Sequence, residues 1–397
     1  MSKVSKSTVS VLEVLPVFRP SMGQEEIDAV AKVMKSGWIG LGPITEEFEK
    51  KFAAFVNAGN AIALSSATAA LHLSLLALGV GKGDEVLVPS LTFVSTSHVV
   101  LYIGAKPVFV DIDEETLCMD PKDLKKKITK KSKAIIPVHY GGHPAELDTI
   151  HDIAKKYKLV VVEDASHATG ARYKDKMVGS LSDLTCFSFH AVKNLAIGDG
   201  GMITTNDKNV TEVARRLRWM GINKNTWERE ELVQEKNYRQ YGWFYDVTDL
   251  GYKCHMNDIA AALGLVQLKK IEKMNRKRKA LTERYTQKLK KYKWLTTPQV
   301  RPWAKSAYHN YVIRTKLRDR LNLFLKARKI SSGVHYFPVH MFSYYKKNNY
   351  HANVPVTEAV WKELLTLPLY PTLSISDQNR VITSIEEFHK ELTTRKQ

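Results

Sequence analysis

The stretch that decides the fold is residues 184–201, LTCFSFHAVKNLAIGDGG, where a lysine follows a β-rich run and precedes a glycine-rich turn. Aromatic and β-branched residues suit residues 184–189 to a buried strand, and the glycines predict a tight return into a second strand at 202–205. Lys193 is therefore expected at the tip of a strand. Its flanks are apolar and Ser188 precedes it, which suits an amine desolvated enough to lose its proton and attack a carbonyl. A lysine at such a tip can also simply be solvated.

Further apolar strands recur along the chain at intervals that leave room for helices. The strands expected before the lysine are residues 107–111, 134–139 and 158–163. Such alternation predicts an α/β fold, with a mainly parallel sheet between helices and ligands at the carboxyl ends of the strands. The length of 397 residues suggests at least two domains, which we place at 1–268 for the large domain and 269–397 for a smaller C-terminal α+β domain.

The sequence AIALSSATAALHLSLLAL, residues 61–78, predicts a short strand, a polar elbow and an apolar helix that is buried on most sides. Ser66 and Thr68 stand where the N-cap of that helix belongs. The positive end of a buried helix, with its free N–H groups, is also a seat for a phosphate group. Capping and phosphate binding are therefore both open for these two residues.

Two further candidates for a site follow the ends of predicted strands. Asp164 follows the strand 158–163, where its carboxylate could cap a helix, pair with an arginine or face a ligand. Phe93 follows another strand, and core packing is the simplest interpretation of an aromatic residue there. A helix is expected at residues 211–220, beyond the lysine segment.

The chain is strongly basic, because 60 Lys and Arg against 41 Asp and Glu give a net charge of +19. A basic surface attracts polyanions, and the densest basic run is residues 269–293. Apolar residues recur there at helical spacing, namely Leu268, Ile271, Met274, Leu281, Tyr285 and Leu289. We therefore interpret the run as the solvated face of a long helix and expect no nucleic-acid partner. A positive field would still speed the capture of a doubly phosphorylated substrate.

The sequence argues against a transmembrane helix, a signal peptide and a metal site. No run of about 18 apolar residues exists, and Glu13 and Pro16 interrupt the apolar start, which argues against a signal peptide. The three cysteines lie far apart without a C-x-x-C pair, which argues against zinc and disulfides and favours a reducing, cytoplasmic compartment. The histidines within residues 309–340 lack a helical pair with an acidic partner, so we expect no metal site.

The segment S-F-H-x-x-K-N-L-x-x-G-D-G-G, residues 188–201, resembles the lysine segment of the DegT/DnrJ/EryC1/StrS family. These proteins are pyridoxal-phosphate sugar aminotransferases of the aspartate-aminotransferase fold. The resemblance extends from about residue 18 to about residue 388. It implies a fold-type-I transferase with a mixed, mainly parallel seven-stranded sheet and with pyridoxal phosphate (PLP) linked to Lys193 as a Schiff base. Some relatives have histidine at this position and dehydrate their substrate, whereas this chain keeps the lysine.

The resemblance also implies which residues hold the cofactor. The family elbow S-G-T-A-A-L holds the phosphate of PLP, which implies Ser66, Ala67 and Thr68 here, with Ser188 beside them. Ala67 replaces the usual glycine, which is tolerable only if its backbone has a negative φ. Asp164 would face the ring nitrogen, where a carboxylate keeps the nitrogen protonated and makes the ring an electron sink.

Residues around the ring and the substrate are implied in the same way. Phe93 matches an aromatic residue that stacks on the pyridine ring. His167 stands where many relatives have glutamine and could bond the phenolic oxygen, although histidine adds a group that titrates near neutrality. Trp38 lies in a loop that the family places near the mouth of the site, and a hydrophobic plug is its simpler interpretation. His309 and Tyr336 are placed near the sugar.

The element GYKCHMND, residues 251–258, resembles the family's G-Y-N-Y-R-M-T-D, with Lys253 and His255 where many members have asparagine and arginine. In the family this element reaches the cofactor phosphate of the neighbouring subunit, although a surface charge would also explain the lysine. It lies too far along the chain to be placed beside the elbow by local connection, so we predict a homodimer with shared active sites. Residues 221–245 are predicted to form an active-site or interface loop.

The activity that the resemblance implies is transamination. PLP, or pyridoxamine phosphate (PMP) after the first half-reaction, would pass the amino group of L-glutamate to the keto carbon of a nucleotide-linked keto-6-deoxysugar, with C4 as the expected position. Lys193 would be the catalytic residue, and the product would serve surface polysaccharide or amino-sugar biosynthesis. An aminocyclitol or 3-keto-sugar aminotransferase would share every motif. A regulatory or nucleic-acid-binding member of the family is a non-catalytic alternative that the charge keeps open.

Overall fold

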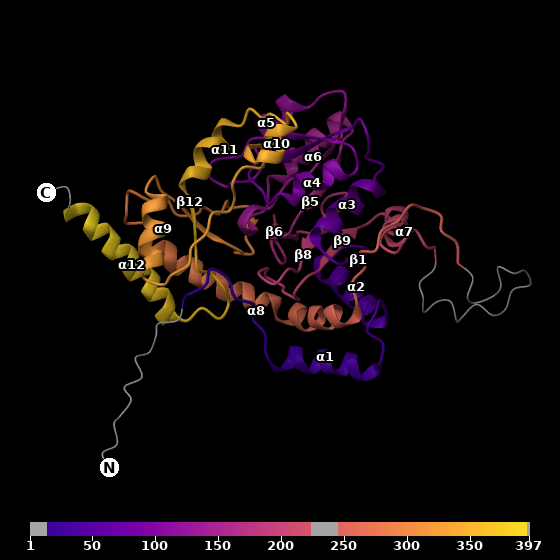
Figure 1. The fold of residues 1–397 in the computed structure, drawn as a ribbon, viewed down its shortest axis with the longest axis horizontal. Coiled ribbons are helices and arrows are strands. Elements are labelled where there is room, and N and C mark those ends of the chain that lie inside the picture. The colour runs from indigo at the N-terminus through magenta and orange to yellow at the C-terminus, as the bar shows by residue number, and fades with distance from the viewer. Residues whose placement is uncertain (1–13, 224–244, 395–397) are drawn as a thin grey trace, which may run out of the picture.

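The computed structural model describes residues 14–223 and 245–394, and a sheet of seven strands lies at its centre (Figure 1). In spatial order the strands are β1 (Asn60–Leu64), β9 (Gly201–Thr205), β8 (Leu184–Ser188), β5 (Val160–Asp164), β4 (Ser132–Ile135), β2 (Glu85–Pro89) and β3 (Lys106–Val110). Neighbouring strands run parallel from β8 to β3, whereas β9 is antiparallel to both β8 and β1. The prediction of a mixed, mainly parallel sheet is therefore confirmed.

Helices cover both faces of this sheet. They are α2 (Pro43–Val56), α3 (Ala67–Ala77), α4 (Ser95–Tyr102), α5 (Pro121–Lys127), α6 (Leu147–Tyr157), α7 (Lys208–Leu217) and α8 (Asp258–Leu289). In β1, Ile62 and Leu64 pack with residues of α3, α4 and α7, whereas Ala61 and Ala63 pack with residues of α2 and α8. Adjacent strand residues point to opposite sides and both sides are apolar, as expected for a parallel sheet that is buried on both faces.

The C-terminal part is built around the far end of α8. Its main elements are β11 (Tyr311–Arg314), α9 (Arg318–Ala327), α10 (Ser343–Lys347), α11 (Pro355–Val360), β12 (Leu364–Leu367) and α12 (Ile375–Thr394). Strands β11 and β12 pair antiparallel. Helix α8 crosses the division proposed at 268/269, Leu15 pairs with Ile330 in the C-terminal core, and Val339 packs in the core of the large sheet. The two domains at 1–268 and 269–397 stay a prediction.

Smaller elements complete the description. Strands β6 (Arg172–Tyr173), β7 (Lys176–Met177) and β10 (Ala304–Lys305) form a separate three-stranded sheet. Helix α1 (Gln24–Ser36) packs along the outside of α8, beneath it in Figure 1. The 3₁₀ turn η1 (Tyr140–Gly142) follows the strand predicted at 134–139, which is shorter than expected because β4 ends at Ile135.

Two helices begin earlier than the sequence predicts, because a side chain caps each of them. The helix predicted at 211–220 is α7, which begins after Asp207. The carboxylate of Asp207 accepts hydrogen bonds from the backbone N–H groups of Asn209 and Val210, at 2.8 and 3.2 Å. The long basic helix is α8, which begins after Asn257, whose Oδ1 accepts from the N–H of Ala260 at 2.9 Å. Five of its six predicted apolar positions, including Ile271 and Tyr285, are buried and Leu268 is partly buried, which confirms the amphipathic pattern.

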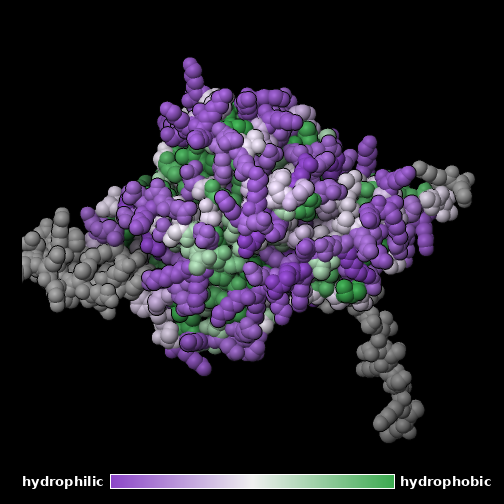
Figure 2. All heavy atoms as spheres, turned by 180° about the vertical axis from the view of Figure 1, so that it is seen from behind, coloured by the Kyte–Doolittle hydropathy of each residue, from purple (hydrophilic) through white to green (hydrophobic). Residues whose placement is uncertain are grey.

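On the face shown in Figure 2, hydrophilic residues cover most of the molecule, and hydrophobic residues gather near the centre of the view. Within the described residues, no helix combines the length and the apolar character needed to cross a bilayer. The first part of the interrupted apolar start, residues 1–13, lies outside the described residues, as does most of the predicted loop 221–245, at 224–244.

Candidate active site

Lys193 lies in the connection between β8 and β9, after Ser188 has closed β8. The connection can turn because Gly198 has a φ of +94°, in the left-handed region that favours glycine. Gly201 opens β9 directly against the backbone of Ser66, where an added Cβ would lie only 2.3 Å from the Ser66 carbonyl carbon. The glycine-rich sequence therefore brings the lysine connection and the elbow into contact.

A cavity of about 370 Å³ opens around Lys193. This volume lies within the range of about 300–1,000 Å³ that is typical of small-molecule sites. The walls come from the elbow, from the residues that follow β2, β5 and β8, and from the C-terminal part. The predicted site residues that line it are Ser66, Ala67, Thr68, Phe93, Asp164, His167, Ser188, Lys193 and Tyr336.

The amine of Lys193 is prepared for nucleophilic chemistry. Burial lowers its pKa from 10.5 to about 8, and the nearby carboxylate of Asp164 opposes this shift only in part. The side chain keeps some exposure, because it lines the cavity. Near pH 8 about half of the amine is neutral, and a neutral amine can attack a carbonyl or take up a proton.

Asp164 ends β5, and two donors fix the orientation of its buried carboxylate. Oδ2 accepts a hydrogen bond from Thr96 Oγ1 at 2.8 Å, and Oδ1 accepts one from the backbone N–H of Ser166 at 3.1 Å. Thr96 is itself hydrogen-bonded to Thr92, with 2.9 Å between the two oxygens. Sequence reasoning missed both threonines, although their four-residue spacing on either side of Phe93 is a signal that could have revealed them.

The elbow combines capping with free donors. Ser66 is the N-cap of α3, and its Oγ accepts from the backbone N–H of Ala69 at 3.1 Å. Ala67 begins the helix and has no positive φ, so the condition for replacing glycine is met. Thr68 Oγ1 lies 2.8 Å from Ser95 Oγ. Because the first N–H groups of a helix have no partner within it, α3 offers donors to an anion in the cavity.

Two neutral histidines stack at the cavity wall, where His167 lines the cavity and His309, predicted near the sugar, does not. The rings of His167 and His309 stack with their centroids 4.3 Å apart, and His167 Nε2 lies 3.0 Å from Tyr336 Oη. Burial lowers the pKa of both histidines well below 6.5, so both rings are uncharged near neutral pH. His309 Nδ1 lies 2.9 Å from the Oδ1 of Asn194, the residue after Lys193. Sequence reasoning missed Asn194, which ties the lysine connection to this pair.

Three predicted residues lie away from the cavity in this chain, and none of them lines it. Trp38 is 42% exposed, and its Nε1 donates to the carbonyl oxygen of Leu41 at 3.1 Å. Lys253 is exposed, with Nζ 3.7 Å from the centre of the Trp219 ring. His255 packs edge-on against the same ring, with the centroids 4.3 Å apart.

The backbone of element 251–258 reaches the elbow within one chain. The carbonyl oxygen of Cys254 accepts from the backbone N–H of Ser65 at 2.7 Å, and the next residue bridges to the last residue of β1. The expectation that this element is too remote to reach the elbow without a partner is therefore corrected for its backbone. Tertiary pairing carries it there, because residues 252–254 bond to the end of α7 and the residue after it.

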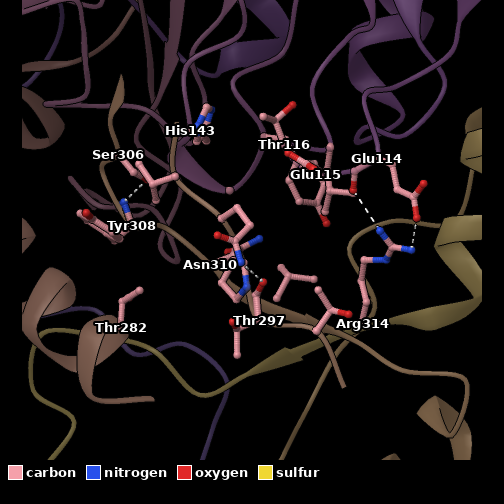
Figure 3. A pocket seen from close by; sticks show the side chains of 18 residues that line it. Glu114, Glu115, Thr116, His143, Thr282, Thr297, Ser306, Tyr308, Asn310 and Arg314 are labelled. Atoms are coloured by element: carbon pink, nitrogen blue, oxygen red, sulfur yellow. Dashed lines mark hydrogen bonds and ion pairs between the residues drawn. The ribbon is translucent and has the colours of Figure 1, made fainter. Parts of the chain in front are cut away.

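A second cavity, of about 110 Å³, is lined in part by Tyr140 and Gly141 of η1 (Figure 3). Asn310 forms part of its wall and is only 7% exposed, yet neither atom of its amide has a hydrogen-bond partner among the described residues. The hydroxyl of Thr282 is also buried without a partner there. Arg314 closes one side and pairs with Glu114 and Glu363.

Comparison with known proteins gives a consistent result. Residues 20–386 match the model of the DegT/DnrJ/EryC1/StrS aminotransferase family. The chain is 41% identical over 393 residues to the spore coat polysaccharide biosynthesis protein SpsC of Bacillus subtilis, and the match covers 95% of this chain and 97% of that protein.

Solved structures resemble the chain over nearly its whole length. Spr1654 from Streptococcus pneumoniae, in its PMP form, is 32% identical with a TM-score of 0.88, and the match covers 95% of this chain and 99% of that one. PseC of Helicobacter pylori, an aminotransferase involved in the biosynthesis of pseudoaminic acid, is 27% identical with a TM-score of 0.86, covering 94% and 99%.

The cavity residues fit pyridoxal phosphate as a bound group. The N-terminus of α3, with Ser66 and Ser188 beside it, would hold the phosphate. Asp164 would face the ring nitrogen, Phe93 would lie beside the ring, and Lys193 would form the covalent link. A free helix N-terminus, an oriented carboxylate and an amine of lowered pKa are the groups that this cofactor requires. Among the described residues, no cluster of three or more His, Cys, Asp or Glu is placed to hold a metal ion.

Proposed function

The chain belongs to the DegT/DnrJ/EryC1/StrS aminotransferase family, whose cofactor is PLP, and on that premise we propose that it transfers the amino group of L-glutamate to the C4 keto carbon of a nucleotide-linked keto-6-deoxysugar. The observation that carries the proposal is the amine of Lys193, whose pKa is lowered to about 8 in a cavity that also contains Asp164. Aminotransfer requires both a proton-shuttling amine and a carboxylate at the ring nitrogen. We place the reaction in the cytoplasm, in the supply of amino-sugars for surface polysaccharide.

The residues of the cavity divide the work of such a reaction. When bound, PLP supplies an electron sink that stabilises negative charge on a neighbouring carbon atom. Asp164, oriented by Thr96, would keep the ring nitrogen protonated. The neutral form of Lys193 would take the proton from the Cα of L-glutamate, and in the second half-reaction its Nζ would return a proton to the sugar carbon. The N–H groups at the start of α3 would hold the cofactor in register with both.

Two relatives support a sugar substrate. PseC takes part in the biosynthesis of pseudoaminic acid, and SpsC takes part in the biosynthesis of spore coat polysaccharide. A nucleotide-linked sugar carries a diphosphate, and the net charge of +19 would raise the rate at which such an anion is captured.

We propose further that two copies of the chain share their active sites. Lys253 is exposed and does not line the cavity of its own chain. Close to it in sequence, Leu250 is 90% exposed and Val247 is 57% exposed, an apolar surface that a partner subunit would cover. In a twofold dimer each copy would present Lys253, and His255 beside it, to the phosphate seat of the other copy.

A substrate panel tests the proposed activity. The purified protein is incubated with PLP, L-glutamate and nucleotide-linked 4-keto sugars, 3-keto sugars and keto-cyclitols, and the aminated products are measured by mass. We expect a 4-amino product and an equal amount of 2-oxoglutarate, with no product from Lys193→Ala. A 3-amino sugar or an aminocyclitol would instead establish one of the alternative substrates, and no product from any member of the panel would contradict the proposal.

A complementation experiment tests the shared site. Lys193→Ala and Lys253→Ala subunits are co-expressed with different tags, and the mixed dimers are purified. A mixed dimer has one site with both lysines intact, so its activity should approach half that of the wild type and exceed that of either mutant dimer, provided that the Lys253→Ala dimer is itself impaired. Full activity in a monomeric fraction would show that the sites are not shared.

A further inference from the structure

His167 and Tyr336 form a hydrogen-bonded pair on the cavity wall, and both nitrogens of the histidine have partners inside the protein. Nε2 lies 3.0 Å from Tyr336 Oη, and Nδ1 accepts a hydrogen bond from the backbone N–H of Gly141 at 3.3 Å. The rings of His167 and Tyr336 are nearly parallel, with an interplanar angle of 19°. The histidine therefore has no nitrogen left for a ligand unless it abandons one of these bonds.

The direction of the hydrogen bond to Tyr336 follows from these contacts. A backbone N–H can only donate, so Nδ1 of His167 must carry the lone pair. Burial, with Lys193 and His335 as additional causes, lowers the pKa of His167, so the ring is neutral and carries one proton. That proton must reside on Nε2, which donates it to Tyr336 Oη.

A phenolic oxygen that accepts a hydrogen bond from one side directs its own proton elsewhere. Tyr336 lines the cavity together with Asp164 and Lys193, so the cavity is where this proton finds an acceptor. We propose that Tyr336 donates a hydrogen bond to an oxygen atom of the molecule bound in the cavity, and that His167 is the positioning residue that fixes the direction of this bond. The acceptor is either the phenolic oxygen of the cofactor or an oxygen of a substrate. The resemblance had placed His167 itself on the phenolic oxygen.

The surroundings hold Tyr336 in this orientation. The hydroxyl of Tyr140 donates to the carbonyl oxygen of His335, the residue before Tyr336. The ring of His335 is anchored in turn, with Nδ1 2.8 Å from Thr366 Oγ1. Phe93 lies against the ring of Tyr336 with the centroids 6.1 Å apart. With its backbone and its ring both held, the tyrosine is preorganised as a donor.

The first experiment needs neither cofactor nor turnover, so it separates this inference from the proposed function on which the nature of the bound molecule rests. In the cofactor-free protein, ¹⁵N NMR of the histidines at pH 7.5 should show His167 protonated at Nε2 and unprotonated at Nδ1, with its signals assigned by their loss in His167→Gln. The opposite tautomer, or a doubly protonated ring, would overturn the inference.

The second experiment identifies the acceptor in the PLP-loaded protein. Tyr336→Phe removes only the hydroxyl, and Tyr345→Phe, at a fully buried tyrosine outside the cavity, is the matched control. If the acceptor is the phenolic oxygen, the pH midpoint of the visible absorbance should rise by about one unit in Tyr336→Phe, because losing a donor destabilises the deprotonated oxygen. If the acceptor belongs to a substrate, the spectrum should stay unchanged, and KM for that substrate should rise about tenfold with kcat nearly constant.

The third experiment tests the role of His167. A glutamine can accept from Gly141 and donate to Tyr336, so His167→Gln should retain the behaviour of the wild type. His167→Leu can do neither and should reproduce the change seen in Tyr336→Phe. A Tyr336→Phe protein with an unchanged spectrum and unchanged KM values, or a His167→Leu protein that behaves as the wild type, would show that the proposed donor does not act.

Discussion

The cavity around Lys193 and the cavity beside Asn310 differ in how their polar groups are arranged. Around Lys193 the buried groups are bonded to one another, as Asp164 is to Thr96, and the cavity volume is about 370 Å³. Beside Asn310 the volume is about 110 Å³, and the buried amide has no partner among the described residues.

The difference shows that a hollow alone does not identify a site for chemistry. Catalysis needs charged and polar groups that are oriented before the substrate arrives and a group whose pKa suits the reaction. Of these two cavities, the one around Lys193 combines both features. The unpaired groups beside Asn310 are the pattern expected where ordered water fills a small polar space. The predictions below test this contrast, in order of decreasing effect.

The largest effect is expected from Lys193→Ala, which removes the amine that distinguishes the first cavity. Turnover should fall by about 10⁴-fold or more, since both the covalent link and the proton shuttle are lost. The PLP-loaded protein should also lose the visible absorbance of the linked cofactor, while its circular dichroism stays that of the folded wild type. If Lys193→Ala transaminated at the wild-type rate, the amine would not distinguish the cavity around Lys193 from the cavity beside Asn310.

Asp164→Asn should produce the next largest effect. The amide is nearly isosteric with the carboxylate but carries no charge to hold the proton on the ring nitrogen, so turnover should fall about 10²–10³-fold. Cofactor affinity, measured by titration, should change far less. Thr96→Val is the matched control, because it removes one hydrogen bond to Asp164 but keeps the charge, and it should cost only about tenfold. Unchanged turnover in Asp164→Asn would make this aspartate purely structural.

Lys193→Met should stabilise the cofactor-free protein in a pH-dependent way. The pKa of Lys193 is about 8 in the folded state against its usual 10.5. Below pH 8 both states are protonated and the fold carries the full cost of a desolvated charge, whereas above pH 10.5 both are neutral and the cost vanishes. Removing the amine should therefore raise the free energy of unfolding by about 3 kcal/mol below pH 8, and the gain should disappear as the pH rises to 10.5. Urea unfolding at pH 7 and pH 10.5 measures it, and an equal gain at both values would contradict the assigned pKa.

Asn310→Leu should have the smallest effect. It removes two buried polar atoms that have no partner among the described residues, so the free energy of unfolding should rise or fall by no more than about 1 kcal/mol, with turnover unchanged. Asn194→Leu is the control, because that amide is bonded to Asn275, Ala307 and His309 and its loss would leave partners unpaired. We expect Asn194→Leu to lower the free energy of unfolding by several times the change seen in Asn310→Leu. Loss of turnover in Asn310→Leu would make the second cavity part of the active site.

Local sequence was sufficient to predict the features that lie close together along the chain. The strand before Lys193, the glycine turn after it and the N-cap at Ser66 each depend on a few adjacent residues, and the structure has all three. The start of α7 was missed by three residues because the cap at Asp207 was not recognised.

Contacts between distant residues could not be predicted in this way. The bonds of Thr96 to Asp164 and of His167 to Tyr336 join residues that are 68 and 169 positions apart, and no spacing rule connects them. The same limit explains why element 251–258 was expected to need a partner to reach the elbow, since its pairing with the end of α7 is tertiary.

Helix α8 connects the loop that carries Trp38 to the C-terminal core. Its 32 residues form one continuous rod of about 48 Å. At one end Asp258 accepts hydrogen bonds from the N–H groups of Ile44 and Thr45, at 3.2 and 2.9 Å, and its own N–H donates to Gly40 in the loop that carries Trp38. At the other end α8 forms part of the C-terminal core. Because a continuous helix moves as one unit, a movement of the C-terminal part would displace α8 and, through Asp258, the loop that carries Trp38.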